Sequence, residues 1–353
     1  MRTPQVDPYC CRTEWQLSYH EAMAPQRKLL VREVPGSVVA FADQQPWNSG
    51  RMFGPLESYW SYGCPLLGPD AVALFDDLLS VFEARADGLA PRFFISGLVP
   101  NGKLIKSLLE KLGSRYKFYQ GPSETLCNAS LEGGFDGFLS RRSAKHRRGL
   151  STQARRVAER GVTFERYVPK DSDTAELEIG SDTNCPPKVE VSTADSHTCL
   201  TNDPISTHHE QLYARMLAVE ETSWKGIEQC GMTVEPSRAY YACMLRRLAA
   251  SGTGRVMFAR HGERDIGYIF GGLAGRVYRG QQFSYAQDWK SYSIGNLLQT
   301  ELIKWLCEDH IHRYDMGPVM DYKMHWAENN YPITTVVLQH KRAESNRQRD
   351  LPF

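Results

Sequence analysis

The sequence has few of the features that place a chain in a membrane, outside the cell or in a disulfide-rich fold. Its 353 residues contain no uninterrupted apolar run of ~18 residues, the length that crosses a bilayer as a helix. The first residues, Met1 to Cys11, include two prolines and lack the apolar centre of a secretory signal. Nine cysteines, an odd number without a repeated spacing, do not indicate a disulfide framework. We therefore expect a cytoplasmic protein with reduced thiols.

The sequence also lacks a large net charge and the motifs of several common enzyme classes. The net charge is +1, so no global field attracts the chain to nucleic acid or a membrane. No Cys-x-x-Cys or His-Glu-x-x-His occurs, and Cys307, His310 and His312 lack the four-ligand spacing of zinc sites, so we expect no metal. The absence of a Gly-x-Ser-x-Gly elbow, a Walker loop and the kinase motifs excludes several further enzyme classes.

What the chain does contain is an ordinary globular composition, 41% hydrophobic and 24% charged, over a length that exceeds the usual single domain. The segment from Lys170 to Thr207 holds eight acidic residues and two lysines without sustained periodicity. It predicts a mobile acidic linker or insertion between two halves. The predicted divisions are an irregular segment 1–35, an N-terminal half 36–170, the linker 171–207, a C-terminal half 208–342 and a polar tail 343–353.

Hydrophobic periodicity predicts secondary structure in both halves. The expected helices are 71–84, 104–112, 209–221, 238–250 and 295–309, and the expected strands are 92–98, 256–259, 266–272, 276–286, 312–316 and 333–339. Strands and helices that alternate in this way predict an α/β layer architecture.

The most informative stretch is 262–326. Gly262 to Asp265 has the composition of a hairpin turn between two apolar strands. A longer strand, 277–285, leads through Ser293 to Leu297 into an amphipathic helix. A small-residue loop that opens a helix presents free N–H groups and the positive end of the helix dipole, which suit a phosphate. Alternatively, Gly295 only permits a tight turn from strand to helix.

This order of strand, loop and helix resembles the acetyl-CoA-binding region of GNAT acyltransferases, whose loop is Gln/Arg-x-x-Gly-x-Gly/Ala. Here Ser291 to Leu297 keeps one glycine and lacks the second. Tyr314-Asp315-Met316-Gly317 and then Asp321 to Trp326 resemble the Asp-x-Gly … Tyr-Lys-x-x-Trp signature of the CelD/BcsL branch of that superfamily, which is related in fold to the Fem aminoacyl-tRNA-dependent ligases. Together with the basic stretch 139–148, the matches cover roughly residues 130–340.

The resemblance implies an α/β (α+β) fold of two GNAT-like halves, each a mixed, mostly antiparallel sheet flanked by helices, with a site at their cleft. It further implies an N-acyltransferase that moves an acyl group from acetyl-CoA or another acyl-CoA to an amine of a small molecule, an envelope component or a specialised metabolite. The residues that it assigns to the donor are Gln281, Ser284, Tyr285, Ser293, Ile294, Gly295, Asn296 and Leu297.

Three residues carry the expected chemistry. Asp315 is expected to accept the amine proton, directly or through water, and Tyr322 to protonate the leaving sulfur. Lys323 is expected to place its charge on a phosphate or on the developing oxyanion. Simpler interpretations stay open: Asp315 as the cap of a following helix, Lys323 as a surface ion pair with Glu328 or Asp321, and Trp326 as a core residue.

The basic helix predicted over 139–160 offers a second kind of site. Between Arg141 and Arg160 there are eight Lys or Arg residues and one acid. This surface suits a phosphate-bearing substrate, the CoA 3′-phosphate or the acceptor stem of a tRNA, unless it is merely a solvated face balanced by the acidic linker. The candidate substrate- and phosphate-binding residues are Arg141, Lys145, Arg147, Arg148 and Trp326.

Two rival functions remain. An aminoacyl-tRNA serves as the acyl donor in the first, as in the Fem relatives, and the degenerate loop at Gly295 and the cationic helix favour it. The second is a binding module that kept the fold without catalysis.

Overall fold

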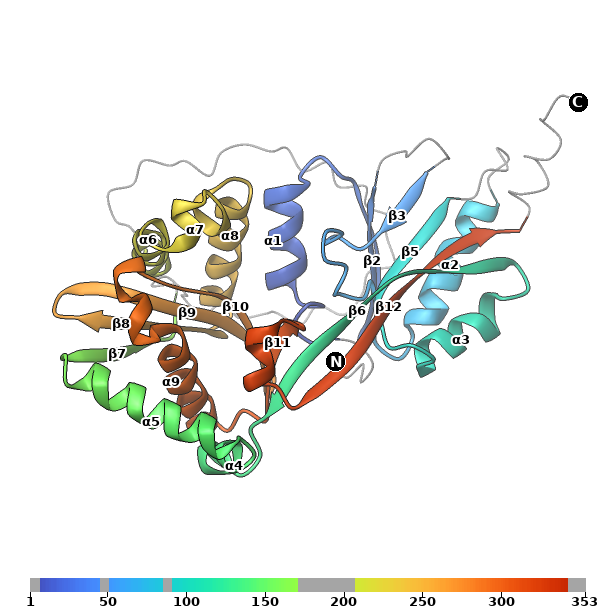
Figure 1. Ribbon diagram of the computed structural model, residues 1–353. Coiled ribbons are helices and arrows are strands. Elements are labelled where there is room, and N and C mark those ends of the chain that lie inside the picture. Colours follow the sequence, from blue (N-terminus) through green and yellow to red (C-terminus); the bar gives the residue numbers. More distant parts are fainter. Residues whose placement is uncertain (1–6, 45–50, 85–90, 171–206, 342–353) are drawn as a thin grey trace, which may run out of the picture.

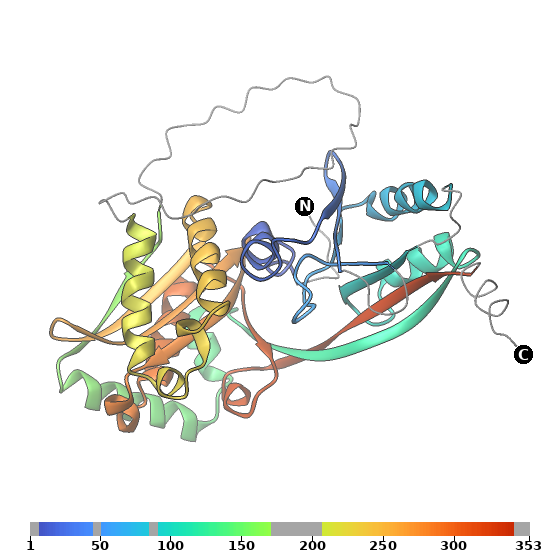
Figure 2. The ribbon, with the colours of Figure 1, turned by 90° about the horizontal axis from the view of Figure 1, so that it is seen from above.

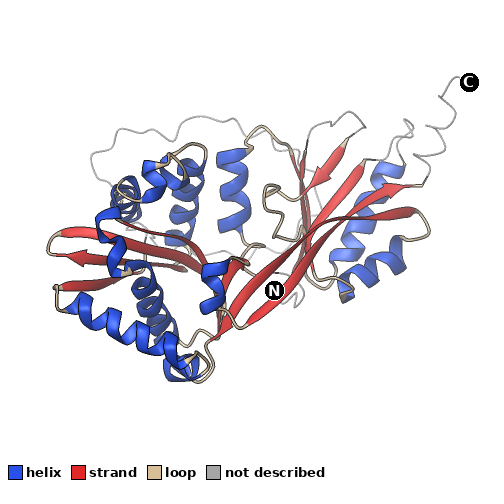
Figure 3. Cartoon of the chain, in the orientation of Figure 1, coloured by secondary structure: helices blue, strands red, loops and turns tan. Residues whose placement is uncertain are grey.

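One sheet runs through the molecule, with helices on both of its faces (Figures 1 and 3). The computed structural model describes residues 7–44, 51–84, 91–170 and 207–341. The strands follow the order β1-β2-β3-β5-β12-β6-β11-β10-β9-β8-β7, and β4 pairs with β2 beside this path. Their bounds are β1 Leu29–Val34, β2 Ser37–Asp43, β3 Met52–Gly54, β4 Leu66–Leu67, β5 Arg92–Leu98, β6 Tyr116–Ser130, β7 Val162–Tyr167, β8 Gly254–His261, β9 Arg264–Ala274, β10 Val277–Tyr285, β11 Arg313–Pro318 and β12 Asn329–His340.

The sheet consists of two halves with the same strand order. β1, β2 and β3 pair antiparallel in sequence, and β3 then lies parallel to β5. In the second half, β8, β9 and β10 pair antiparallel, and β10 lies parallel to β11. In both halves a helix connects the two parallel strands, α2 (Ala71–Glu83) in the first and α9 (Ile294–Glu308) in the second. The predicted fold class, a mixed and mostly antiparallel sheet flanked by helices, is confirmed.

The two halves exchange one strand. β5 of the first half pairs with β12, from the end of the chain, whereas β11 of the second half pairs with β6, from the first half of the chain. The long β6 and β12 also pair with each other and form the ribbon that joins the halves (Figure 2). A division near residue 170 therefore cuts across the sheet, and β7 pairs with β8 beyond it.

Helices cover the second half of the sheet on opposite faces, as Figure 1 shows. One layer holds α1, α6, α7 and α8, and the other holds α4, α5 and α9. α2 and α3 cover the first half. The remaining bounds are α1 Thr13–Met23, α3 Lys103–Leu112, α4 Gly134–Ser140, α5 Ala144–Ala158, α6 His208–Glu221, α7 Trp224–Ile227 and α8 Ser237–Ala250, with 3-10 helices at η1 Gly231–Thr233, η2 Gln287–Tyr292 and η3 Asp321–His325.

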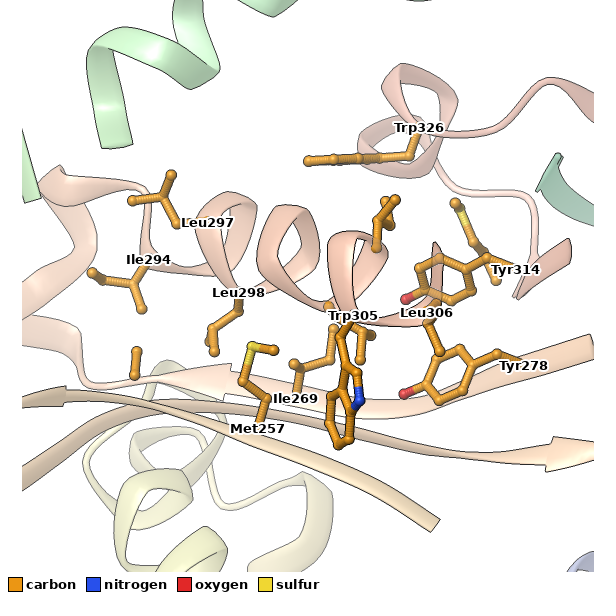
Figure 4. Packing of buried hydrophobic residues seen from close by; sticks show 14 of the residues in the cluster. Met257, Ile269, Tyr278, Ile294, Leu297, Leu298, Trp305, Leu306, Tyr314 and Trp326 are labelled. Atoms are coloured by element: carbon orange, nitrogen blue, oxygen red, sulfur yellow. The ribbon is translucent and has the colours of Figure 1, made fainter. Parts of the chain in front are cut away.

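The position of α9 is fixed by its buried side. Leu298, Leu302 and Leu306 are fully buried against the strands, in a cluster that also takes in Met257 and Ile269 (Figure 4). Each such side chain contributes about 1.5–3 kcal/mol when it leaves water. The amphipathic pattern predicted this helix, and its packing holds the loop before it against β10.

The sequence prediction of an irregular segment over 1–35 is wrong, because α1 and β1 lie there. α1 has little amphipathic pattern but packs against α8 through Trp15 and Tyr19, and this tertiary contact determines the helix. The predicted acidic linker and polar tail lie outside the described residues. None of the helices in the described ranges combines the length and the hydropathy that a membrane crossing requires.

Candidate functional site

The parallel strands β10 and β11 separate partway along their length. They pair at Val277 with Arg313, Tyr278 with Tyr314 and Arg279 with Asp315, and at no position after that. Bulges in both strands lie at this point, between Gly280 and Gln282 and between Asp315 and Gly317. Beyond it each strand stays paired only with its outer neighbour, β9 or β6. These two strands therefore part beyond Arg279 and Asp315, and we call the opening between them the fork.

Two adjoining cavities occupy the fork. The smaller, about 60 Å³, reaches Ile269 and Gln299 on the α9 face of the sheet. The larger, about 540 Å³, extends to the opposite layer, where α1, α7 and α8 lie. Both cavities share residues 280–283, Met316, Tyr322 and Lys323. The fork thus connects the two faces of the sheet.

Lys323 and Tyr322, predicted from their motif, both line the fork. Lys323 Nζ donates a hydrogen bond to the carbonyl oxygen of Pro318 at 2.9 Å. Burial and, to a smaller extent, the nearby Arg279 lower the pKa of Lys323 to about 8, while Cys127 opposes the shift. Burial in the cavity wall raises the pKa of Tyr322 to about 12, although the side chain as a whole is 46% exposed. At neutral pH the site therefore presents an ammonium and a protonated phenol.

The simpler interpretation of Lys323 as a surface ion pair is wrong. Glu328 is bound by Arg141 and Arg142, and among the described residues no carboxylate lies within ion-pair distance of Lys323. Its charge is directed to the cavity, with one bond to a backbone carbonyl.

Asp315 is fully buried in the middle of β11 and lines neither cavity. Arg313 donates to its Oδ2 at 3.1 Å, while Oδ1 has no hydrogen-bond partner. Burial and the neighbouring Asp7 raise the pKa of Asp315 to about 6, while Arg313 and Arg279 oppose the shift. Because Asp315 lies inside a strand, the interpretation as a helix cap is wrong.

A buried ion pair lies next to Asp315. Arg279 donates to Asp7 Oδ2 at 2.7 Å, and both side chains are almost completely buried. The other carboxylate oxygen of Asp7 accepts from the backbone N–H groups of Tyr9 and Cys10. These bonds hold residues 7–10 next to the point where β10 and β11 separate.

Lys225 is a site residue that the sequence analysis missed. Its Nζ lies in the wall of the larger cavity and donates to Gln282 Oε1 at 2.7 Å and to the carbonyl oxygen of Phe283 at 3.0 Å. Glu220, fully buried, lies 3.6 Å away. Burial lowers the pKa of Lys225, and Glu220 opposes the shift. A single lysine in a four-residue helix carries no sequence spacing that would have indicated this position.

Comparison with known proteins agrees with this geometry. Residues 200–324, about a third of the chain, match the family described as Acetyltransferase (GNAT) domain. The chain carries a GNAT-fold domain. No curated protein sequence matches it significantly.

Solved structures resemble the chain over nearly its whole length, at low identity. FemX is 11% identical with a TM-score of 0.57, covering 98% of this chain and 95% of that one. A conserved protein of unknown function from Bacteroides thetaiotaomicron is 9% identical with a TM-score of 0.57, covering 95% and 92%. L-PGS from Bacillus licheniformis is 11% identical with a TM-score of 0.50, covering 96% and 94%. These likenesses concern the fold; none of them confirms the CelD/BcsL branch.

The donor residues predicted for the GNAT-fold domain fall into two groups. Gln281, Ser284 and Tyr285 line the larger cavity. The other five, Ser293 to Leu297, form the start of α9, where Ile294, Gly295 and Leu297 are buried and Asn296 is exposed. A Cβ atom on Gly295 would lie 3.1 Å from the ring of Phe283, so this glycine permits close packing of α9 on β10.

The basic helix α5 lies beside the start of α9. Arg156 and Arg160 stack on Tyr292, 4.7 and 4.8 Å from its ring centre, directly before the α9 loop. These two arginines were not among the predicted site residues. Of those that were, Lys145 and Arg148 are exposed.

The other predicted residues of this segment have structural partners. Arg141 binds Glu328, and Arg147 donates to the carbonyl oxygen of Arg142 at 2.6 Å. Trp326 is 2% exposed and stacks on Phe138, which confirms its interpretation as a core residue.

The first half of the sheet differs from the second at the equivalent position. β3 and β5 pair only at Met52 with Arg92 and at Phe53 with Phe93. Beyond these pairs, a Cβ atom on Gly97 would lie 2.4 Å from the carbonyl oxygen of Tyr62, so the chain itself fills the equivalent space. Within the ranges that the structure describes, no group of three or more His, Cys, Asp or Glu residues is placed to hold a metal ion.

Proposed function

We propose that this protein is an N-acyltransferase that moves an acyl group from an acyl-CoA to an amine. The observation that carries the proposal is the fork: two parallel strands part beside the N-terminus of α9, and a lysine lies in the opening. The unpaired edges of β10 and β11 offer peptide groups to the amides of a pantetheine arm.

The donor enters from the α9 face. Its phosphates would lie at the N-terminus of α9, where backbone N–H groups and the helix dipole attract anions. Arg156 and Arg160, beside that loop, add two positive charges. The arm then passes through the fork, and the acyl group reaches the larger cavity on the opposite face.

The transfer forms an amide and breaks a thioester. The amine nitrogen attacks the thioester carbon, and the ammonium of Lys323 stabilises the resulting oxyanion. The C–S bond breaks, and Tyr322 gives its proton to the leaving thiolate. The amine proton passes to water in the open cavity, and the phenolate of Tyr322 regains a proton from the same solvent.

Asp315 has a different role in this proposal from the one that its motif suggested. Because it lines neither cavity, we assign it to hold Arg313 and Arg279 at the end of the paired ladder. Its expected role as the acceptor of the amine proton stays an untested prediction.

Donor binding is tested by thermal unfolding against a panel of acyl-CoAs. A ligand at one hundred times its dissociation constant adds ~2.7 kcal/mol to the free energy of unfolding. We expect such stabilisation from at least one acyl-CoA and N-acyl product when an amine is added. No stabilisation across the panel contradicts the proposed donor. Stabilisation without transfer to any amine would instead favour the non-catalytic binding module.

One observation favours a second candidate, an aminoacyl-tRNA donor. Lys145, Arg148 and Arg155 are exposed along the 15-residue α5 and form a cationic stripe suited to a phosphate backbone. Radiolabelled aminoacyl-tRNA, incubated with the protein and candidate acceptors, separates the two donors. Label that appears in a small product and disappears after ribonuclease treatment of the donor identifies the tRNA.

A further inference from the structure

The larger cavity continues well beyond the fork, into a chamber that the donor arm does not fill. Its far wall is built by aromatic residues from three separate parts of the chain: Trp15 of α1, Trp60 and Tyr62 of the loop before β4, and Trp224 and Tyr241 of α7 and α8. We call these five residues the aromatic wall. Because the proposed function places the donor phosphates on the other face of the sheet, this wall faces whatever receives the acyl group.

Three rings of the aromatic wall hold one another in fixed orientations. Trp15 and Tyr62 are stacked, with ring centres 6.3 Å apart and planes 26° apart. Trp15 Nε1 donates to Glu57, which is fully buried and also accepts from three backbone N–H groups. Trp60 packs 5.4 Å from Trp15 and keeps a partly exposed face. A preformed wall of flat rings suits a flat or apolar group.

All the charged side chains among the described lining residues of the chamber are positive. Three cations line it, Lys225, Arg279 and Lys323, and none of the described lining residues is acidic. Glu220 balances Lys225, and Asp7 balances Arg279, both from behind the wall. Lys323 has no such partner among the described residues. The chamber therefore carries an uncompensated positive charge, which attracts an anion and repels a simple alkylammonium ion.

Two polar groups that line the chamber outside the aromatic wall also lack hydrogen-bond partners. The hydroxyl of Ser284, a residue only 2% exposed, has no hydrogen-bond partner, and neither has Nε2 of Gln281. An unpaired buried polar group destabilises the empty protein, and a bound ligand can satisfy it. These groups indicate that the chamber binds a ligand with polar atoms as well as an apolar part.

We propose that the acceptor is an amine that also carries a carboxylate and a flat apolar group, which is the chemistry of an aromatic α-amino acid. The amine follows from the proposed function; the carboxylate and the ring follow from the chamber. In an α-amino acid the carboxylate is attached to the carbon that bears the amine, so an amine placed for attack beside Lys323 brings the carboxylate to the same ammonium. The flat side group then lies against the aromatic wall.

The test is calorimetric titration of the full-length protein with matched small molecules, without donor and with saturating CoA. Phenylalanine is compared with phenylalaninamide and phenethylamine, which lack the carboxylate, and with alanine, which lacks the ring. We expect phenylalanine to bind at least about tenfold more tightly than each of the other three molecules. Phenylalaninamide and phenethylamine lose one charge-assisted contact, and alanine loses one buried ring. Equal or tighter binding of phenylalaninamide overturns the carboxylate, and equal binding of alanine overturns the ring. Absence of phenylalanine binding in both arms overturns the proposal as a whole.

Variants locate the binding. Lys323→Met removes the preference for phenylalanine over phenylalaninamide, whereas Trp60→Ala weakens both equally. Lys106→Gln, on the exposed side of α3, is the matched control and leaves all affinities unchanged. A Lys323→Met protein that keeps the full preference overturns the assignment. Donor titration separates this proposal from the function on which it rests: acyl-CoA binding without phenylalanine binding rejects only the acceptor.

Discussion

Arg279 and Asp315 form the last pair of the parallel ladder between β10 and β11, and the larger cavity opens at this point, lined by Arg279, Gly280 and Met316. The strands separate just where their buried charges meet. Arg279 is held by Asp7 from the start of the described chain, and a Cβ atom on Gly317 would lie 3.2 Å from its guanidinium. Asp7, Arg279 and Asp315 therefore lie where the pairing between β10 and β11 ends, and Arg279 also lines the larger cavity.

The ion pair between Asp7 and Arg279 is a stability determinant. Removal of one partner leaves a buried charge without compensation, so Asp7→Asn should lower the free energy of unfolding by about 3–5 kcal/mol. Urea unfolding measures the change. Asp288→Asn is the matched control, because its pair with Arg264 is about half exposed on both sides and contributes at most ~1 kcal/mol. Equal effects of the two substitutions contradict a special role for the buried pair.

Lys323 should determine turnover and have little effect on folding. Lys323→Ala removes the charge that stabilises the oxyanion, and we expect more than about tenfold loss of kcat/KM. The thermal transition should shift little, because the buried ammonium is itself unfavourable in the folded state. Steady-state rates with the best donor of the panel give the comparison. Activity of the alanine variant within a factor of about two of the wild type would remove the assignment.

The same residue predicts a pH dependence. Burial lowers the pKa of Lys323 from its ordinary value to about 8, so its charge is lost as the pH rises through about 8. Turnover that needs the ammonium should fall above that pH. The acceptor amine gains reactivity over the same range, and therefore the quantity to measure is the wild-type rate divided by the Lys323→Arg rate, in which the amine titration cancels. A ratio that stays flat between pH 7 and 10 is incompatible with a catalytic ammonium of lowered pKa.

Arg156 and Arg160 should distinguish the two candidate donors. Their replacement by Glu places two negative charges beside the α9 loop, which should weaken acyl-CoA binding by about tenfold or more, and more strongly at low salt. The same replacement of Lys145 and Arg148, exposed near the start of α5, is the control. If the control pair weakens activity more than the Arg156 and Arg160 pair, the aminoacyl-tRNA donor gains support.

Local patterns predicted the second half of the sheet closely. The residues of β10 and α9 form one apolar strand and one amphipathic helix, and Gly262 indicated the turn between β8 and β9, where its φ is +59°. By contrast, β6 was missed. Its middle, residues 120–125, is polar and largely exposed, and the strand exists because β12 pairs with it from the far end of the chain.

The candidate site could be predicted only where its residues share a motif. Tyr322 and Lys323 stand together in one signature, and both line the fork. Asp7, Trp60 and Lys225 come from distant parts of the chain, and only the fold brings them to the same cavity or to its floor. Asp315 belongs to the signature but is buried behind the ladder, which sequence spacing cannot indicate because it does not report depth.

The fork itself is tested most directly by amide hydrogen exchange with and without the donor. A pantetheine arm that pairs with the open strand edges should slow exchange in residues 280–285 and 316–318, on the unpaired side of each strand. The paired residues 277–279 and 313–315 should exchange at the same rate in both states. Unchanged exchange of the fork residues at saturating donor, with protection confined to α5 or elsewhere, would show that the acyl group is carried by another route and would contradict the account.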